Sequence, residues 1–272
     1  MEKIKKWVQA LCVRPIPASE QEIVNQVREY LQILILKIIY QSKFGHFLSF
    51  MGGTSLRICY DLKRYSEDLD FCLDEPSKVY DFSEMIYCIQ RELSLLGFSV
   101  STNVHQDKTV QKAFVRIADI GEILRLKTFR KNQKLHIKVE VDIRPIPLEK
   151  GERESFFVNR FQEIFPILKH NLPTLFAGKI LAILQRPYER GRDYYDLIWY
   201  LGRKTPVNLD YLNRGRSEKP FTSWSEVLKI LEEKIKTVKP RTLLKDLQPF
   251  LEDPSEEQWI LKYQDLFEQL RQ

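Results

Sequence analysis

Two aspartates two residues apart, Asp68 and Asp70, are the side chains best suited to chemistry in this chain of 272 residues. They lie in the stretch 66–71, whose sequence Ser-Glu-Asp-Leu-Asp-Phe predicts a β-strand. Side chains alternate along a strand, so we expect both carboxylates on one face and Leu69 and Phe71 on the other. Two negative charges this close need a nearby cation, and Mg²⁺ is a good candidate because it prefers oxygen ligands.

A glycine-rich turn, Gly52-Gly53-Thr54, precedes this strand. It follows the apolar run 47–51, which predicts a buried strand, and it leads into a short predicted helix with Thr54 as its cap. Free backbone N–H groups at such a helix N-terminus bind phosphate readily. A Gly-Gly turn or an Asp-x-Asp pair is common by itself, but the order strand, turn, helix and acidic strand is far more specific. It indicates a phosphoryl-transfer site.

A third acidic position is expected, because sites that hold two metal ions usually need three carboxylates. Glu140 and Asp142 are the candidates, in a strand predicted at 135–143. In that strand Lys138 shares their face, opposite to the apolar side chains. The alternative is that both acidic residues are solvated on an open sheet face.

A second group of charged residues lies further along the chain. Asp193, Asp196 and Tyr200 are spaced to lie on one stripe of a helix, and Lys179 belongs to the helix before it. A lysine is well suited to the terminal phosphates of a nucleotide, and an aspartate could hold that lysine in place or act as a base. The spacing alone favours the alternative, a structural ion-pair network of Lys179 and Arg192 with both aspartates.

The rest of the sequence predicts the elements that position these groups. An amphipathic helix is expected at 20–41, behind a capping box that starts at Ser19, and a second helix at 80–96. Further strands are expected at 98–104, 110–118, 122–129 and 135–143. A mixed sheet with flanking helices is an α+β arrangement.

The composition of the chain changes near residue 150, where Pro145, Pro147 and Gly151 lie close together. Beyond that point we expect helices to the end of the chain. The sequence therefore predicts an α+β domain at 1–150 that carries the Asp-x-Asp strand, and a helical bundle at 151–272 that carries Lys179 and the Arg-Asp-x-x-Asp motif.

Composition indicates an ordinary globular protein, with 43% hydrophobic and 29% charged residues. The net charge of +6 favours a polyanionic partner, although a slightly basic surface would account for it equally well. The cysteines and histidines are scattered without zinc-ligand spacing, which predicts reduced thiols. The sequence contains no pattern typical of a signal peptide or membrane span, so we expect a cytoplasmic protein.

The motifs GGTSLR…RYSEDLDF and AGKILAILQR…RDYYDL resemble those of the AbiEii/AbiGii toxins, a branch of the polymerase-β-like nucleotidyltransferases. The resemblance spans roughly residues 45–202. It implies a polymerase-β-like N-terminal domain and transfer of nucleotides from an NTP, with Mg²⁺ or Mn²⁺ and release of pyrophosphate. It also implies the 3′ acceptor end of tRNA as target, so that translation is blocked in a toxin–antitoxin or abortive-infection system. A cognate antitoxin is then expected, which no residue here identifies.

The resemblance also implies roles for individual residues. The metal ligands are Asp68, Asp70 and Glu140, the last from the strand IKVEVDI, with Asp142 as a substitute. Toxins of this branch require a lysine and an aspartate that match Lys179 and Asp193, which leaves Asp196 a structural role. Nucleotide binding is expected from Gly52, Gly53, Thr54 and Lys179, in a cleft between the domains. Basic residues that suit RNA, or equally a nucleotide alone, are Arg130, Lys131, Lys134, Arg190 and Arg192.

Two other functions remain open at this point. A nucleotidyltransferase of this type could modify a small molecule or a protein hydroxyl, although the basic surface argues against a cationic small molecule. A non-catalytic nucleotide- or RNA-binding protein could share the fold, although the presence of every expected carboxylate and of the lysine argues against a degenerate enzyme.

Overall fold

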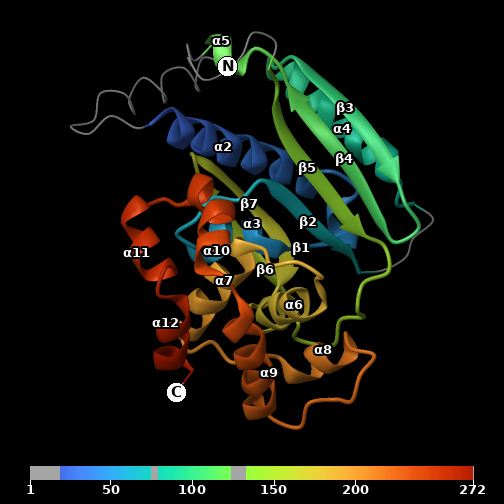
Figure 1. Ribbon diagram of the computed structural model, residues 1–272. Coiled ribbons are helices and arrows are strands. Elements are labelled where there is room, and N and C mark those ends of the chain that lie inside the picture. The colour runs from blue at the N-terminus through green and yellow to red at the C-terminus, as the bar shows by residue number, and fades with distance from the viewer. Residues whose placement is uncertain (1–18, 75–78, 124–132, 272) are drawn as a thin grey trace. The chain divides into compact units, whose positions relative to one another are not determined.

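The computed structural model describes residues 19–74, 79–123 and 133–271 (Figure 1). The chain forms two compact units that interleave along the sequence. The first consists of Met1–Tyr60, Tyr65–Pro145 and Ser155–Lys169, and the second of Asp61–Arg64, Ile146–Glu154 and His170–Gln272. A mixed sheet with flanking helices and a helical C-terminal region confirm the predicted α+β fold class.

One sheet of seven strands, in the order β3-β4-β5-β2-β1-β7-β6, carries the predicted carboxylates. β2 runs parallel to β5 and β1 parallel to β7, whereas β1–β2, β3–β4 and β4–β5 are antiparallel. The strand bounds are β1 Leu48–Met51, β2 Asp68–Leu73, β3 Val100–Gln106, β4 Val110–Ile117, β5 Leu135–Asp142, β6 Arg153–Arg160 and β7 Glu163–His170.

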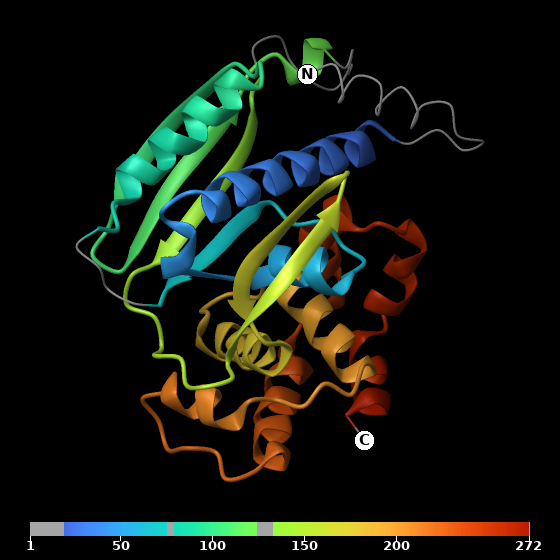
Figure 2. The same ribbon diagram turned by 180° about the vertical axis from the view of Figure 1, so that it is seen from behind.

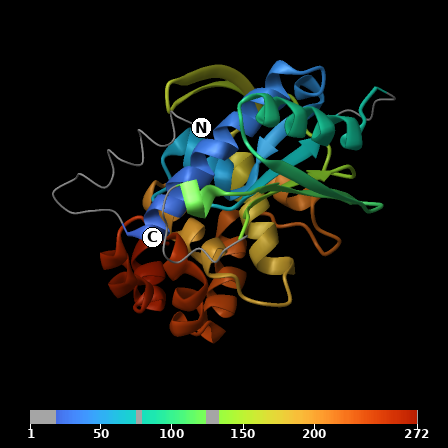
Figure 3. The same ribbon diagram turned by 90° about the horizontal axis from the view of Figure 1, so that it is seen from above.

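Two helices, α2 (Glu20–Gln41) and α4 (Phe82–Leu95), cover one face of the sheet, and both predicted helices are thereby confirmed (Figure 2). They contact each other and lie side by side in the view from above (Figure 3). Every second residue of β4 from Ala113 onward and of β5 from Leu135 onward, such as Val115 and Val139, is buried beneath them. The predicted cap of α2 is also observed, because Ser19 Oγ accepts a hydrogen bond from the Glu22 N–H at 3.1 Å.

The glycine-rich turn opens α3 (Gly52–Tyr60), whose far end is held by a buried ion-pair network. Glu29 of α2, only 5% exposed, accepts from Arg57 Nε at 2.8 Å and from Arg160 Nη1 at 3.0 Å. The guanidinium of Arg160 also donates to the backbone carbonyls of Arg57 and Ile58 in the last turn of α3. Cations at a helix C-terminus satisfy its unpaired carbonyls and oppose its dipole. The network therefore fixes the helix that carries the turn.

The hairpin of β6 and β7 corrects the expectation of helices only after residue 150. Its two turn residues, Phe161 and Gln162, have φ of 53° and 64°. A two-residue turn with positive φ at both positions is normally signalled by Asn-Gly or Asp-Gly. Phe-Gln gives no such signal, which is why the strands were missed.

The second unit is helical, with two short 3-10 segments among its helices. Its helices are α6 Leu172–Gln185, α7 Gly191–Gly202, α8 Leu209–Arg214, α9 Trp224–Thr237, α10 Pro240–Leu247, α11 Glu257–Ile260 and α12 Tyr263–Leu270. In the first unit, a 3-10 turn at Gly45–Phe47 precedes β1. The strand predicted at 122–129 is wrong at its start, because Glu122 lies in α5 (Ile120–Ile123), and its remainder lies outside the described residues. Among the described residues, no helix is long and apolar enough to cross a membrane.

Candidate functional site

The three predicted acidic residues lie on two neighbouring strands in matching register. Asp68 and Asp70 alternate with the buried Leu69 on β2, so both carboxylates lie on the face opposite to α2 and α4. On the adjacent parallel strand β5, Glu140 is the direct partner of Asp70. Neighbouring strands lie about 4.8 Å apart, so the carboxylates of Asp70 and Glu140 start from adjacent backbone positions.

The register also ranks the two candidates for the third carboxylate. Asp142 is paired with Cys72, two residues beyond Asp70 along β2, and its Oδ1 accepts from the Arg144 N–H at 2.9 Å. Burial raises the pKa of Asp142, and the hydrogen bond from Arg144 lowers it by less. Glu140 is therefore the better placed partner for Asp70.

Two lysines that were not among the predicted site residues contact Glu140. Lys138 Nζ lies 2.6 Å from one carboxylate oxygen and Lys112 Nζ 3.7 Å from the other. Burial lowers the pKa of Lys138, but Glu140, Asp68 and Asp70 together raise it above its ordinary value. The alternation of the strand IKVEVD, which places Lys138 on the face of Glu140, was the signal for it.

The donor set fits a hard divalent cation, because it offers carboxylate oxygens from one face of two adjacent strands. Within the described part of the chain, no three acidic, histidine or cysteine side chains are already gathered as a metal site. Glu140 instead contacts Lys138 and Lys112. Asp68 and Asp70 would therefore be the first ligands, and Glu140 would have to leave its lysines to join them.

The glycine-rich turn lies directly against the acidic strand. A Cβ atom on Gly52, whose φ is +76°, would stand 2.3 Å from Asp70 Oδ2. The hydroxyl of Thr54 donates to the Asp68 carbonyl, and Thr54 is buried in the first turn of α3. The expectation that Thr54 caps this helix is therefore wrong, because the helix starts two residues earlier. Contact between the turn and a phosphate would come from backbone N–H groups.

We expect the substitution Gly52→Ala to lower nucleotide transfer by at least about a hundred-fold, because the added methyl group must displace the Asp70 carboxylate. The measurement is the initial rate of transfer by the purified variant. Gly97→Ala is the matched control, since Gly97 also has positive φ, +86°, but nothing within 4 Å of its Cβ position. Equal loss in both variants would mean that backbone strain, and not displacement of Asp70, is responsible.

The second predicted group forms a dense ion-pair cluster inside the second unit. Lys179 Nζ lies 2.7 Å from Asp193 Oδ1 and 2.8 Å from Asp196 Oδ2. Asp196 is fully buried and also accepts two hydrogen bonds from Arg64, at 2.7 and 2.6 Å. Arg186 pairs with the second oxygen of Asp193. The ion-pair alternative is thus observed for Lys179 and both aspartates.

The electrostatics of Asp193 favour a positioning role over that of a base. Its burial raises the pKa, but Lys179, Arg186 and Arg190 outweigh this and lower the pKa to about 2. A carboxylate with so low a pKa accepts a proton poorly at neutral pH. Asp193 is better suited to holding the ammonium group of Lys179 in place.

The same shift predicts a pH dependence of stability. Because folding lowers the pKa of Asp193 from 3.8 to about 2, its charged form stabilises the fold above pH 4. That contribution, about 2 kcal/mol, is lost as the pH falls from about 4 to 2. In urea unfolding, the difference in free energy of unfolding between the native protein and Asp193→Asn should shrink over this window. A difference that stays constant down to pH 2.5 would contradict it.

Of the residues predicted to contact RNA, Lys134 belongs to the first unit and Arg190 and Arg192 belong to the second. Arg130 and Lys131 lie outside the described residues, whereas Lys134 is exposed just before β5. Arg190 is the residue before α7. Arg192 is buried and stacks over the Phe250 ring at 4.3 Å, so it would have to move to reach RNA.

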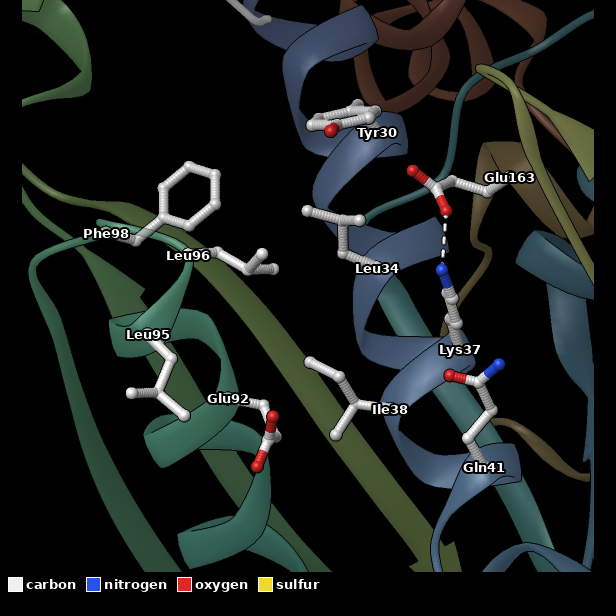
Figure 4. A pocket seen from close by; sticks show the side chains of 10 residues that line it. All are labelled: Tyr30, Leu34, Lys37, Ile38, Gln41, Glu92, Leu95, Leu96, Phe98 and Glu163. Atoms are coloured by element: carbon white, nitrogen blue, oxygen red, sulfur yellow. Dashed lines mark hydrogen bonds and ion pairs between the residues drawn. The ribbon is translucent and has the colours of Figure 1, made fainter. Parts of the chain in front are cut away.

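A cavity of about 410 Å³ lies on the helical side of the first unit, away from the acidic strand (Figure 4). It is bordered by α2, the end of α4 and one residue of β7, and an ion pair of 2.8 Å between Lys37 and Glu163 closes one side. None of the predicted site residues lines it; the lining residues are Tyr30, Leu34, Lys37, Ile38, Gln41, Glu92, Leu95, Leu96, Phe98 and Glu163.

Comparison with solved structures finds the same fold in other proteins. A Helicobacter pylori protein is 18% identical, covering 93% of this chain and 96% of that one, with a TM-score of 0.57. JHP933 from the same species is 17% identical over 93% of each chain, with a TM-score of 0.54. MenT4, a nucleotidyltransferase toxin from Mycobacterium tuberculosis, is 16% identical, covering 98% of this chain and 90% of that one, with a TM-score of 0.56.

Comparison of the sequence with protein families gives a match, whereas comparison with individual curated proteins does not. No curated protein matches the chain significantly. The family model described as "Nucleotidyl transferase AbiEii toxin, Type IV TA system" matches residues 34–272, which include both predicted motifs and the acidic strand β5. The chain therefore belongs to the AbiEii nucleotidyltransferase toxin family of type IV toxin–antitoxin systems.

Proposed function

We propose that this nucleotidyltransferase uses a divalent metal ion to transfer nucleotides from an NTP to the 3′ acceptor end of tRNA, and so blocks translation. The single observation that carries the chemistry is the register of β2 and β5, which pairs Asp70 with Glu140 beside the Gly52 turn. Carboxylates and helix N–H groups at adjacent positions suit a metal–triphosphate complex.

In this proposal Asp68, Asp70 and Glu140 hold Mg²⁺ or Mn²⁺. The metal supplies two effects: it lowers the pKa of the attacking hydroxyl and offsets the charge on the departing pyrophosphate. The N–H groups of Gly52, Gly53 and Thr54 belong to the first turn of α3, which offers them no partner within the helix, and they bind the triphosphate. Because Gly52 abuts the Asp70 carboxylate, the turn that would bind the phosphates is held directly against the acidic strand.

Lys179 is the further nucleotide ligand in this proposal, and Asp193 positions it. The ammonium group is only partly exposed and is held by two carboxylates, so its orientation is set before a nucleotide arrives. Asp196, bound by both Arg64 and Lys179, serves the stability of the second unit.

The choice of tRNA rests on the resemblance and on the net charge of +6, which suits a polyanion. Membership of a toxin–antitoxin family implies an antitoxin partner. NTPs and tRNA meet in the cytoplasm, which is the location we propose. The family and the basic charge favour this acceptor over a cationic small molecule.

The test incubates the protein with total bacterial tRNA, Mg²⁺ and each α-labelled NTP in turn. We expect one or more NTPs to label tRNA, and periodate-oxidised tRNA, which lacks the 3′ diol, to stay unlabelled. Label on a protein or small molecule instead would overturn the tRNA target but keep the enzyme. Label on none of these would favour the binding-protein alternative.

A further inference from the structure

The face of the sheet that carries the carboxylates continues beyond them onto β4 and the first half of β5. On this face β4 presents Lys112, Phe114 and Arg116, because the residues between them, Ala113 and Val115, are buried beneath the helices. The same alternation places His136 and Lys138 of β5 on this face. We call these five residues, Lys112, Phe114, Arg116, His136 and Lys138, the basic face.

Strand register makes the basic face a continuous row. Lys112 is paired with Glu140, Phe114 with Lys138, and Arg116 with His136. With a rise of about 3.4 Å per residue, the row extends about 14 Å along β4, away from Glu140. One end of it therefore lies at the carboxylates, and the other end leads away from them.

The row is positive, and among the described strands its compensating charge lies only at the end where Lys112 and Lys138 contact Glu140. β3 and β4 contain no aspartate or glutamate, and in β5 the acidic residues are confined to the end at Glu140 and Asp142. Nε of Arg116 is buried and has no hydrogen-bond partner among the described residues. Burial lowers the pKa of His136, and the charges that lower it further, those of Arg116, Lys134 and Arg28, are all cationic.

An aromatic ring lies in the middle of these cations. Phe114 is half-buried and lies between Lys112 and Arg116 along β4, with Lys138 and Asn103 as its cross-strand partners. Cations that follow a phosphate backbone, combined with an aromatic ring on which bases stack, are the equipment of surfaces that bind single-stranded nucleic acid. A free nucleotide would not need a row of this length.

We propose that the basic face binds the single-stranded 3′ end of the acceptor RNA, with a base stacked on Phe114 and phosphates at Arg116 and Lys112, so that the terminal hydroxyl reaches Asp68 and Asp70. This rests on the proposed function for the identity of the acceptor. It adds the surface that binds the RNA, the path of the RNA chain along that surface and the residue on which a base stacks.

The test measures binding without catalysis, by fluorescence anisotropy of a 5′-labelled single-stranded RNA oligonucleotide ending in CCA, at several salt concentrations and without NTP. We expect Arg116→Gln to weaken binding and to reduce the slope of log affinity against log salt by about 0.7 for the lost phosphate contact. We expect Phe114→Leu, which keeps an apolar side chain but removes the ring, to weaken binding at least about five-fold with no change in slope.

Lys108→Gln is the matched control, because Lys108 is exposed in the turn between β3 and β4, beyond the acidic end of the row. It should bind RNA within about two-fold of the native protein. Native affinity and slope in both Arg116→Gln and Phe114→Leu would overturn the inference. So would weaker binding of a fluorescent NTP with unchanged binding of RNA, because the cations would then serve the nucleotide.

The two proposals fail in distinguishable ways. Loss of RNA binding in both variants, in a protein that transfers nucleotides to no RNA, would support the basic face and overturn the proposed function. Labelled tRNA with unaltered RNA binding in both variants would support the proposed function and overturn the basic face as the RNA-binding surface.

Discussion

The substitution Asp70→Asn is expected to lower nucleotide transfer by at least about a thousand-fold while leaving the free energy of unfolding unchanged or raised. A metal ion contributes several kcal/mol to the stabilisation of the transition state, and each 1.4 kcal/mol is a factor of ten in rate. Asp70 lies beside Asp68 and opposite Glu140, so removing its charge relieves repulsion among three carboxylates, which offsets the lost attraction to Lys138. The measurements are the rate of label transfer and urea unfolding of the same preparation.

The combination of lost activity and retained stability separates a catalytic role from a structural one. Asp107→Asn is the matched control, since Asp107 is an exposed aspartate in the loop between β3 and β4 of the same unit. It should keep native activity. Transfer by Asp70→Asn at more than a tenth of the native rate would exclude Asp70 as a metal ligand.

The substitution Asp196→Ala is expected to have the largest effect on stability, a loss of about 3–5 kcal/mol in the free energy of unfolding. Asp196 is fully buried and accepts two hydrogen bonds from Arg64, whose side chain is 2% exposed. Removing the carboxylate leaves that guanidinium buried without its counter-charge and takes one of two carboxylates from Lys179. Urea unfolding monitored by circular dichroism measures the loss.

An exposed aspartate of the same unit serves as the control that ties the loss of stability to the buried ion pair. Asp210 is exposed in the first turn of α8, and Asp210→Ala should cost less than about 1 kcal/mol. A loss in Asp196→Ala no larger than in Asp210→Ala would contradict the structural role. Native stability of Asp196→Ala combined with lost transfer would assign Asp196 to the chemistry instead.

The local parts of this structure were predictable from sequence, because short-range patterns determine them. The capping box at Ser19 fixed the start of α2, and alternation in β5 placed Glu140 on the face opposite to Val139. The motif order was enough to put the Gly52 turn beside the acidic strand, although it did not predict that the glycine touches Asp70 itself.

Long-range electrostatics were not predictable in the same way. Arg64 lies within the first motif, but its partner Asp196 is 132 residues away, and no local pattern joins them. Glu29 likewise pairs with Arg160 across 131 residues. Nothing in the sequence of its helix indicated that this charge would be buried. The β6–β7 hairpin was missed because Phe161 and Gln162 adopt positive φ without the residues that usually mark such a turn.

The central claim is that Asp68 and Asp70 bind the catalytic metal ion. The most direct test is a crystal structure with Mn²⁺ and a non-hydrolysable NTP, in which anomalous scattering locates the metal. We predict a Mn²⁺ peak bonded to both aspartates, about 2 Å from their oxygens, with Glu140 released from Lys138 to face it. Mn²⁺ bound to the triphosphate but remote from both aspartates would contradict the account.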